Sequence, residues 1–218
     1  MLDMPMSECG THPHLFYKGF DMLQLLIGLV LFLGIHSLQS LAPQMRQNGL
    51  ARWGTLGFKA VYAAIAVLGL YLLVQGYGQA RLDPLVLWTP PRGMQHATIL
   101  LMWVAMVLLV ASYVPGNQIK AKLRHPMTLS VKVWSLGHLL SNGNLADVLL
   151  FGGFLVWSVL VFRAARKRDR MSMHTAPEGK LLGTLLAVVV GTGVWAAFLM
   201  GGLHVWLVGV MPFTRAGG

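Results

Sequence analysis

The chain has few charged residues and almost no cysteine. Of its 218 residues only 11% are charged, whereas 56% are hydrophobic. This balance is too apolar for a water-soluble domain, so it predicts an integral membrane protein in contact with a lipid bilayer. The single cysteine, Cys9, excludes an intramolecular disulfide, an iron–sulfur cluster and a cysteine-based zinc site.

Acidic residues are also scarce, because 7 Asp and Glu stand against 17 Lys and Arg. In a soluble protein such an excess would suggest nucleic acid. Here most of the basic residues lie in three connecting segments, 42–59, 115–132 and 163–180. The positive-inside rule places these segments in the cytoplasm and both termini outside. The positions of the basic residues are thus explained by the orientation of the chain in the membrane, and no nucleic-acid partner is expected.

Several catalytic patterns are missing as well. The sequence has no Ser-His-Asp constellation, no phosphate-binding glycine loop and no paired carboxylates, and Asp147 is the only acid inside a predicted span. These absences argue against a hydrolase, a kinase and a proton pump.

Long apolar runs dominate what remains, and they predict an all-α, polytopic membrane helix bundle with about six transmembrane helices. The polar residues 1–21 have no basic start typical of a signal peptide, so we expect an N-terminal extension, disordered or the result of an upstream start, before one transmembrane domain at 22–218. Glycines inside the runs predict close helix packing, such as Gly28, Gly34, Gly152, Gly153, Gly191 and Gly193. The runs cover residues 22–41, 58–77, 97–114, 127–141, 145–162 and 181 to about 208.

The segment 120–144 combines basic residues, two histidines and a turn. Pro126 suits the first turn of a helix and restricts His125 before it, so a helix is predicted to begin here. Its fifteen or so residues span only about 22 Å, less than a bilayer core. The Asn-Gly-Asn turn at 142–144 then predicts an antiparallel hairpin with the next run.

His36 lies well inside the first predicted span and His138 well inside the fourth, whereas His204 lies near the outer end of the last. Two imidazoles on different helices are a common ligand set for a six-coordinate haem b. The alternative is that each histidine only packs and hydrogen-bonds within the bundle. Counting from the cytoplasmic ends of their spans, the two histidines differ in depth by roughly 9 Å.

Three basic residues, Lys120, Lys122 and Arg124, could supply a cation for haem propionates. His125 lies at the cytoplasmic edge of its helix. It is interpreted as a helix-entry residue, with a direct role as an alternative ligand or an acid/base as the second interpretation.

Five motifs together resemble the NnrU family, and the resemblance covers nearly everything from Met22 onward. They are GIHSLQS, YGQARLDPLVLWTPP, NQIKAKLRHPM, KVWSLGHLLSNGNLADVLLFGGFLVW and HVWLVGVMPF. The family includes the zeta-carotene isomerases, which are haem b membrane enzymes, and bacterial members named for nitrite and nitric oxide reduction.

The resemblance implies that His36 and His138 are axial haem ligands and that His125 lies near the site. It implies an accessory protein or sensor in nitric oxide and denitrification metabolism, in the bacterial cytoplasmic (inner) membrane, with nitric oxide and the nitrite or nitric oxide reductase machinery as partners. The alternative is a haem-dependent cis–trans isomerase of an apolar polyene. Asn144 departs from the aspartate that is usual in the family.

A weaker resemblance is to membrane methyltransferases of the isoprenylcysteine carboxyl type, which also carry Arg-His-Pro before a hairpin. The corresponding downstream segment here, RAARKRDRMSMHTAPEG, lacks their paired glutamates. A haem-free structural subunit is the remaining alternative.

Overall fold

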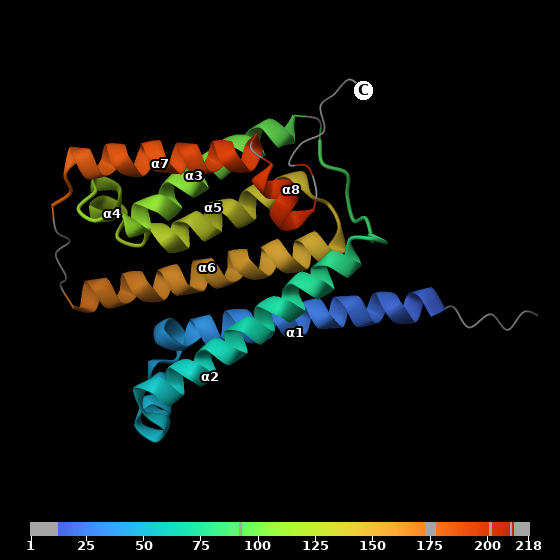
Figure 1. Cartoon of the computed structure of the whole chain (residues 1–218), viewed down its shortest axis with the longest axis horizontal. Coiled ribbons are helices and arrows are strands. Elements are labelled where there is room, and N and C mark those ends of the chain that lie inside the picture. The colour runs from blue at the N-terminus through green and yellow to red at the C-terminus, as the bar shows by residue number, and fades with distance from the viewer. Residues whose placement is uncertain (1–12, 92, 173–177, 201, 210, 212–218) are drawn as a thin grey trace, which may run out of the picture.

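Eight helices form the part of the chain described by a computed structural model, which covers residues 13–91, 93–172, 178–200, 202–209 and 211, with side chains from residue 19 (Figure 1). The same residues contain no strand beyond two isolated bridges. The helices are α1 (Pro13–Leu41), α2 (Pro43–Ala80), α3 (Met94–Tyr113), α4 (Gln118–Leu123), α5 (Pro126–Ser141), α6 (Leu145–Met171), α7 (Leu181–Leu199) and α8 (Leu203–Val208).

The all-α architecture predicted from the sequence is confirmed. Five described helices, α1, α2, α3, α6 and α7, are long and apolar enough to cross a membrane. The one remaining expected segment, 127–141, is α5, a helix of 16 residues. At about 24 Å it is shorter than a bilayer core, as predicted. The chain is therefore a multi-pass helical bundle of the membrane type.

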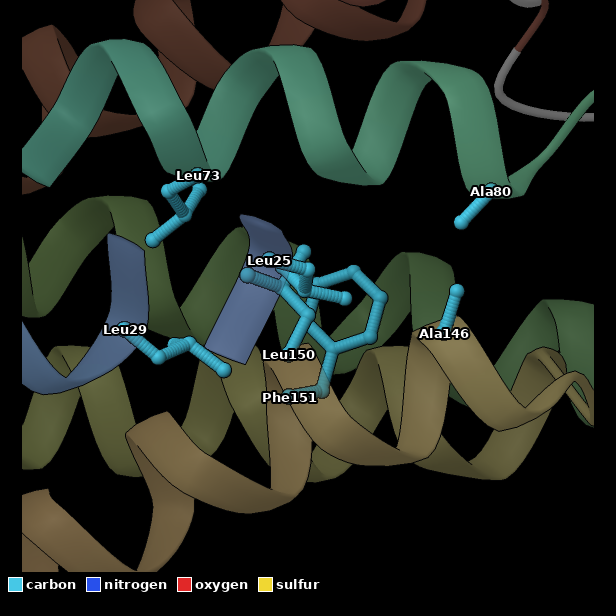
Figure 2. Packing of buried hydrophobic residues seen from close by; sticks show 7 residues of the cluster. All are labelled: Leu25, Leu29, Leu73, Ala80, Ala146, Leu150 and Phe151. Atoms are coloured by element: carbon cyan, nitrogen blue, oxygen red, sulfur yellow. The ribbon is translucent and has the colours of Figure 1, made fainter. Parts of the chain in front are cut away.

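The bundle consists of two helix groups joined by α6. In one group α1 packs along α2, and in the other α3 packs against α5 and α7. Helix α6 contacts both α1 and α5, so it connects the groups (Figure 1). Buried side chains from three helices meet at this junction (Figure 2): Leu25, Leu29, Leu73, Ala80, Ala146, Leu150 and Phe151.

Glycines allow α1 and α2 to approach closely. A Cβ on Gly28 would collide with the backbone of Leu73, and one on Gly69 would lie 2.7 Å from the backbone nitrogen of Phe32. The close packing expected at Gly28 is confirmed, and so is that at Gly191 in α7. The same expectation is wrong for Gly34, Gly152 and Gly193, because nothing lies within 4 Å of a Cβ built there.

Several helices are longer than the apolar runs that predicted them. Helix α1 already begins at Pro13, inside the expected extension, and α6 continues to Met171 through a segment predicted as a loop. Ala, Arg and Lys are good helix formers, so a charged segment can continue a helix beyond the lipid. The last run, by contrast, is not one helix: it breaks after Leu199, where Gly202 adopts a φ of 75° before α8.

Two further helical segments lie in expected connections. Helix α2 starts at Pro43 rather than near residue 58, and it bends sharply at Gly54. The short α4 was missed altogether. It begins where the Asn117 side chain accepts a hydrogen bond from the backbone nitrogen of Lys120 at 2.7 Å, an N-cap that the Pro-Gly-Asn sequence could have indicated.

The two ends of the bundle differ in composition. The basic end holds the end of α1, the start of α2, α4, and the end of α6 (Figure 1). The loop end holds the hairpin turn 142–144 and the segment 81–93, of which the described residues 81–91 are not helical. There the backbone nitrogens of Leu87 and Trp88 donate to the Gly143 carbonyl at 2.8 and 3.2 Å, and that of Leu145 donates to Leu85 at 2.9 Å. These bonds hold the segment 81–93 against the turn between α5 and α6. The structure confirms the predicted hairpin of these two helices.

Candidate functional site

His138 lies on α5 in an aromatic environment. Its ring is stacked on Phe151 of α6, with centroids 4.4 Å apart and planes at 7°, and it meets the edge of Trp134 at 5.4 Å. The amide nitrogen of Asn142 lies 3.4 Å from Nδ1 and donates to the His138 carbonyl at 2.8 Å. The hydrogen bonds of His138 among the described residues involve Nδ1 and the carbonyl oxygen, so Nε2 is the ring nitrogen that would coordinate a metal.

Polar groups from α2, α6 and α8 surround the same place. The Tyr77 hydroxyl donates to Oδ1 of Asp147 at 2.6 Å, and Asp147 is only 2% exposed. The Arg81 guanidinium lies over the Tyr77 ring, 5.2 Å from its centroid. His204 of α8 is near enough to His138 to interact with it electrostatically. We call Tyr77, Arg81, His138, Asp147 and His204 the loop-end cluster.

His36 occupies a different setting on α1. Its Nδ1 lies 2.6 Å from the carbonyl oxygen of Phe32, and its ring contacts those of Phe32 and Tyr62 at 4.3 and 5.6 Å. A bond from Nδ1–H to a backbone carbonyl is the usual way to orient a metal-binding histidine through Nε2. The same bond also satisfies a histidine that only packs within the bundle.

A layer of aromatic rings separates the two histidines. Phe32 of α1 contacts Phe154 of α6 at 6.0 Å, and Phe154 contacts Trp134 of α5 at 5.5 Å. Since α1 and α5 run in opposite directions, His36 lies one turn from this layer toward the basic end and His138 one turn toward the loop end.

The side-chain contacts with α6 give the same separation. Ser37, next to His36, accepts a hydrogen bond from Nε1 of Trp157 at 3.0 Å, whereas His138 stacks on Phe151. Those two positions on α6 differ by about 9 Å in height. The offset predicted from the sequence is therefore present, and the structure does not bring the two imidazoles face to face.

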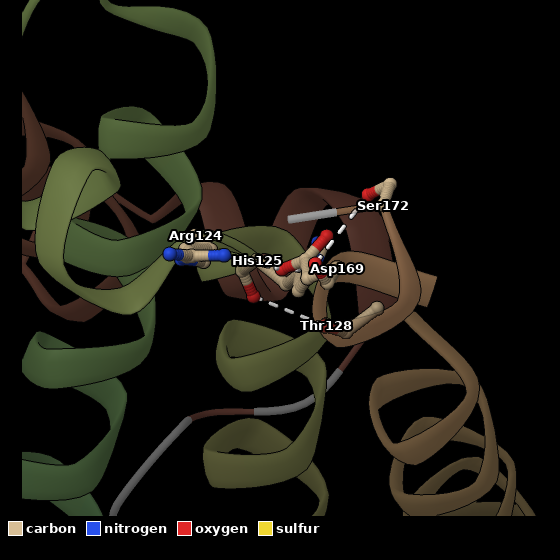
Figure 3. A network of polar contacts seen from close by, with 5 residues as sticks. All are labelled: Arg124, His125, Thr128, Asp169 and Ser172. Carbon is tan, nitrogen blue, oxygen red and sulfur yellow. Dashed lines mark hydrogen bonds and ion pairs between the residues drawn. The ribbon is translucent and has the colours of Figure 1, made fainter. Parts of the chain in front are cut away.

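His125, Arg124 and Lys120 lie at the basic end, remote from His138. His125 Nε2 is 3.0 Å from Oδ2 of Asp169, and Arg124 Nη1 is 3.5 Å from the same oxygen (Figure 3). The Lys120 ammonium donates to the Ser112 carbonyl at 2.9 Å. Two of the three cations predicted to serve propionates, Lys120 and Arg124, thus have protein partners. Asp169 was missed because the sequence placed it in a loop rather than on α6.

A haem held between His36 and His138 does not fit this arrangement, since both axial ligands would have to face one porphyrin from opposite sides. His138 alone fits as a ligand, with aromatic walls and Arg81 as a cation at the same end, although the Arg81 guanidinium also lies over Tyr77 and donates to the Val208 carbonyl at 3.4 Å. Within the described ranges no group of three or more His, Cys, Asp or Glu side chains could hold a bare metal ion.

Comparison with known proteins places the chain in a family. The model of the family described as NnrU protein matches residues 24–212. No curated protein and no solved structure matches the chain. The family match spans the helices that build both ends of the bundle, including the hairpin that carries His138. Because it covers most of the sequence, the chain belongs to the NnrU family.

Proposed function

We propose that this membrane protein binds haem b through His138 and acts in nitric oxide and denitrification metabolism as an accessory protein or sensor. The main supporting observation is the packing of the His138 ring between Phe151 and Trp134, with Asn142 beside Nδ1. When bound, the haem would supply an iron that takes up nitric oxide. Membership of the NnrU family supports the same proposal.

The residues around His138 have separable roles in this proposal. Phe151 and Trp134 fix the plane of the imidazole and exclude water, and Asn142 lies beside Nδ1. Arg81 provides positive charge at the same end of the bundle, where an anionic propionate would be stabilised.

A signal can leave this site along a short path. His138 lies one turn before the 142–144 turn, whose Gly143 carbonyl accepts two backbone hydrogen bonds from the segment 81–93. A shift of the α5–α6 hairpin would therefore move this segment, which is the surface we assign to a reductase or its assembly machinery.

The test is the absorption spectrum of the detergent-purified protein, oxidised and then reduced with dithionite, with haem supplied during expression. We expect a Soret band and the broad reduced visible band of a haem with one histidine ligand, in the wild type and in His96→Ala, a control histidine exposed on α3. His138→Ala should lose these bands. A colourless wild type, or an unchanged spectrum in His138→Ala, would overturn the proposal.

His36→Ala decides the ligand set in the same experiment. Bands that persist in this variant agree with the separation of the two histidines across the aromatic layer. Bands that disappear would establish His36 as the second ligand and would require α1 and α5 to shift relative to each other. The isomerase alternative stays a prediction from the resemblance, to be tested by product analysis after incubation with a cis-polyene.

A further inference from the structure

The start of α2 forms an elbow at the basic end of the bundle. The helix runs from Pro43 to Trp53, bends at Gly54 with φ 66° and ψ 177°, and continues as the long membrane segment (Figure 1). Only glycine adopts this backbone conformation readily. A Cβ on Gly49 would lie 2.8 Å from the ring of Phe58, so the two arms of the elbow pack closely.

A partly open cavity of about 370 Å³ lies between the elbow and the end of α1. This volume is within the range of small-molecule pockets. Asn48 and Arg52 provide polar groups in its wall. Most of the remaining wall is apolar and includes Ile35, Leu38, Phe58, Val61 and Ile65.

The charged residues of the elbow itself are all positive. Arg46, Arg52 and Lys59 lie on it, and no Asp or Glu occurs between residues 42 and 82. None of these three cations makes an ion pair in the part of the chain that the structure describes. The elbow also exposes Trp53, and tryptophan is enriched where membrane and water meet.

We propose that this cavity binds an anionic phospholipid, with an acyl chain along the apolar wall and the phosphate beside Arg52. Three observations support this occupant: the cavity is partly open and mostly apolar, it belongs to a membrane bundle, and Arg52 lines it while Arg46 and Lys59 lie on the same elbow. An anionic headgroup is favoured over a zwitterionic one because basic groups near a membrane surface attract anionic lipid.

Filling the cavity is the first test. Val61→Phe adds a ring to the apolar wall, and Val67→Phe is the matched control, on the same helix but at a site that is 67% exposed. Purified proteins are compared by native mass spectrometry after exposure to vesicles of phosphatidylglycerol or phosphatidylcholine. We expect Val61→Phe, and not Val67→Phe, to lose bound phosphatidylglycerol. Equal retention by both variants would refute the site.

Removing the charge is the second test. Arg52→Gln should weaken phosphatidylglycerol binding about fivefold, whereas Arg52→Lys should retain it. Arg170→Gln, which removes one exposed cation from the same end of the bundle, should leave binding unchanged. Equal binding of phosphatidylcholine by the wild type would contradict an anionic ligand, and so would equal losses in Arg52→Gln and Arg170→Gln.

Discussion

At the scale of single residues, Asp169 connects α6 to the junction between α4 and α5. One of its carboxylate oxygens contacts both His125, the residue that precedes α5, and Arg124 (Figure 3). Arg124 has a φ of 64°, the only positive φ of a non-glycine residue among those described. The contact therefore ties a strained junction between α4 and α5 to the last turns of α6.

Replacing Asp169 with Asn should loosen this junction. We expect the melting temperature to fall by about 2 °C, because an ion pair near the surface contributes little. The difference should shrink in high salt, which screens such pairs. Thermal unfolding at low and high ionic strength measures both effects, with Glu178→Gln as a control that removes one exposed carboxylate. Identical shifts in the two variants would contradict a specific role for Asp169.

Local patterns predicted some of these residues and not others. The proline rule located the start of α5, and helix counting gave the depth offset between His36 and His138. The pair formed by Tyr77 and Asp147 was not predictable in this way. Its members are 70 positions apart, and a partner across two helices depends on packing that no local pattern encodes.

At the scale of elements, the contact between α1 and α2 depends on missing side chains. In a bilayer, close helix association relies on small residues that let backbones approach. Gly28 of α1 meets the backbone of Leu73, whereas Gly34, two turns further along the same helix, has nothing within 4 Å of a built Cβ. The two glycines therefore form a natural pair for comparison.

Gly28→Ala should destabilise the protein by about 1–3 kcal/mol, because the added methyl overpacks the contact with α2. Gly34→Ala should be neutral or stabilising by up to about 1 kcal/mol, since alanine is the better helix former and open space is available. Unfolding of both variants in detergent provides the measurement. Equal stability of Gly28→Ala and Gly34→Ala would contradict the close contact between α1 and α2 at Gly28.

The ends of the helices also show what hydrophobicity can predict. An apolar run marks the part of a helix that lies in lipid, not the whole helix. Both α2 and α6 extend well into polar or basic segments that the sequence assigned to connections. The observed helix ends depend on helix propensity, and the bend inside α2 depends on Gly54. A hydrophobic pattern reports neither of them.

At the scale of the whole molecule, the basic and loop ends form opposite faces of the bundle (Figure 1). The positive-inside rule predicts that the basic end faces the cytoplasm and that the segment 81–93 faces outward. Both ends offer an exposed residue suitable for labelling: Leu82 is 79% exposed and Met171 is 74% exposed.

Cysteine labelling tests this orientation. In a Cys9→Ser background, Leu82→Cys should react with a membrane-impermeant maleimide in intact spheroplasts, and Met171→Cys should react only after permeabilisation. The natural chain has one cysteine, so a single substitution gives the clean background. The opposite labelling pattern would reverse the predicted topology and would place the lipid cavity in the other leaflet.

The division into two helix groups joined by α6 has a consequence for biogenesis. The ribosome makes α1 and α2 first, and no contact links α2 to α3 within the described residues. Leu25 and Leu29 can pack on α2 at once, but the side of them that faces α6 must remain against lipid until Leu150 and Phe151 emerge more than a hundred residues later. The two helix groups can therefore assemble with each other only after α6 has been made. A nascent chain stopped before α6 should remain as loosely associated hairpins, open to capture by membrane proteases or insertion chaperones.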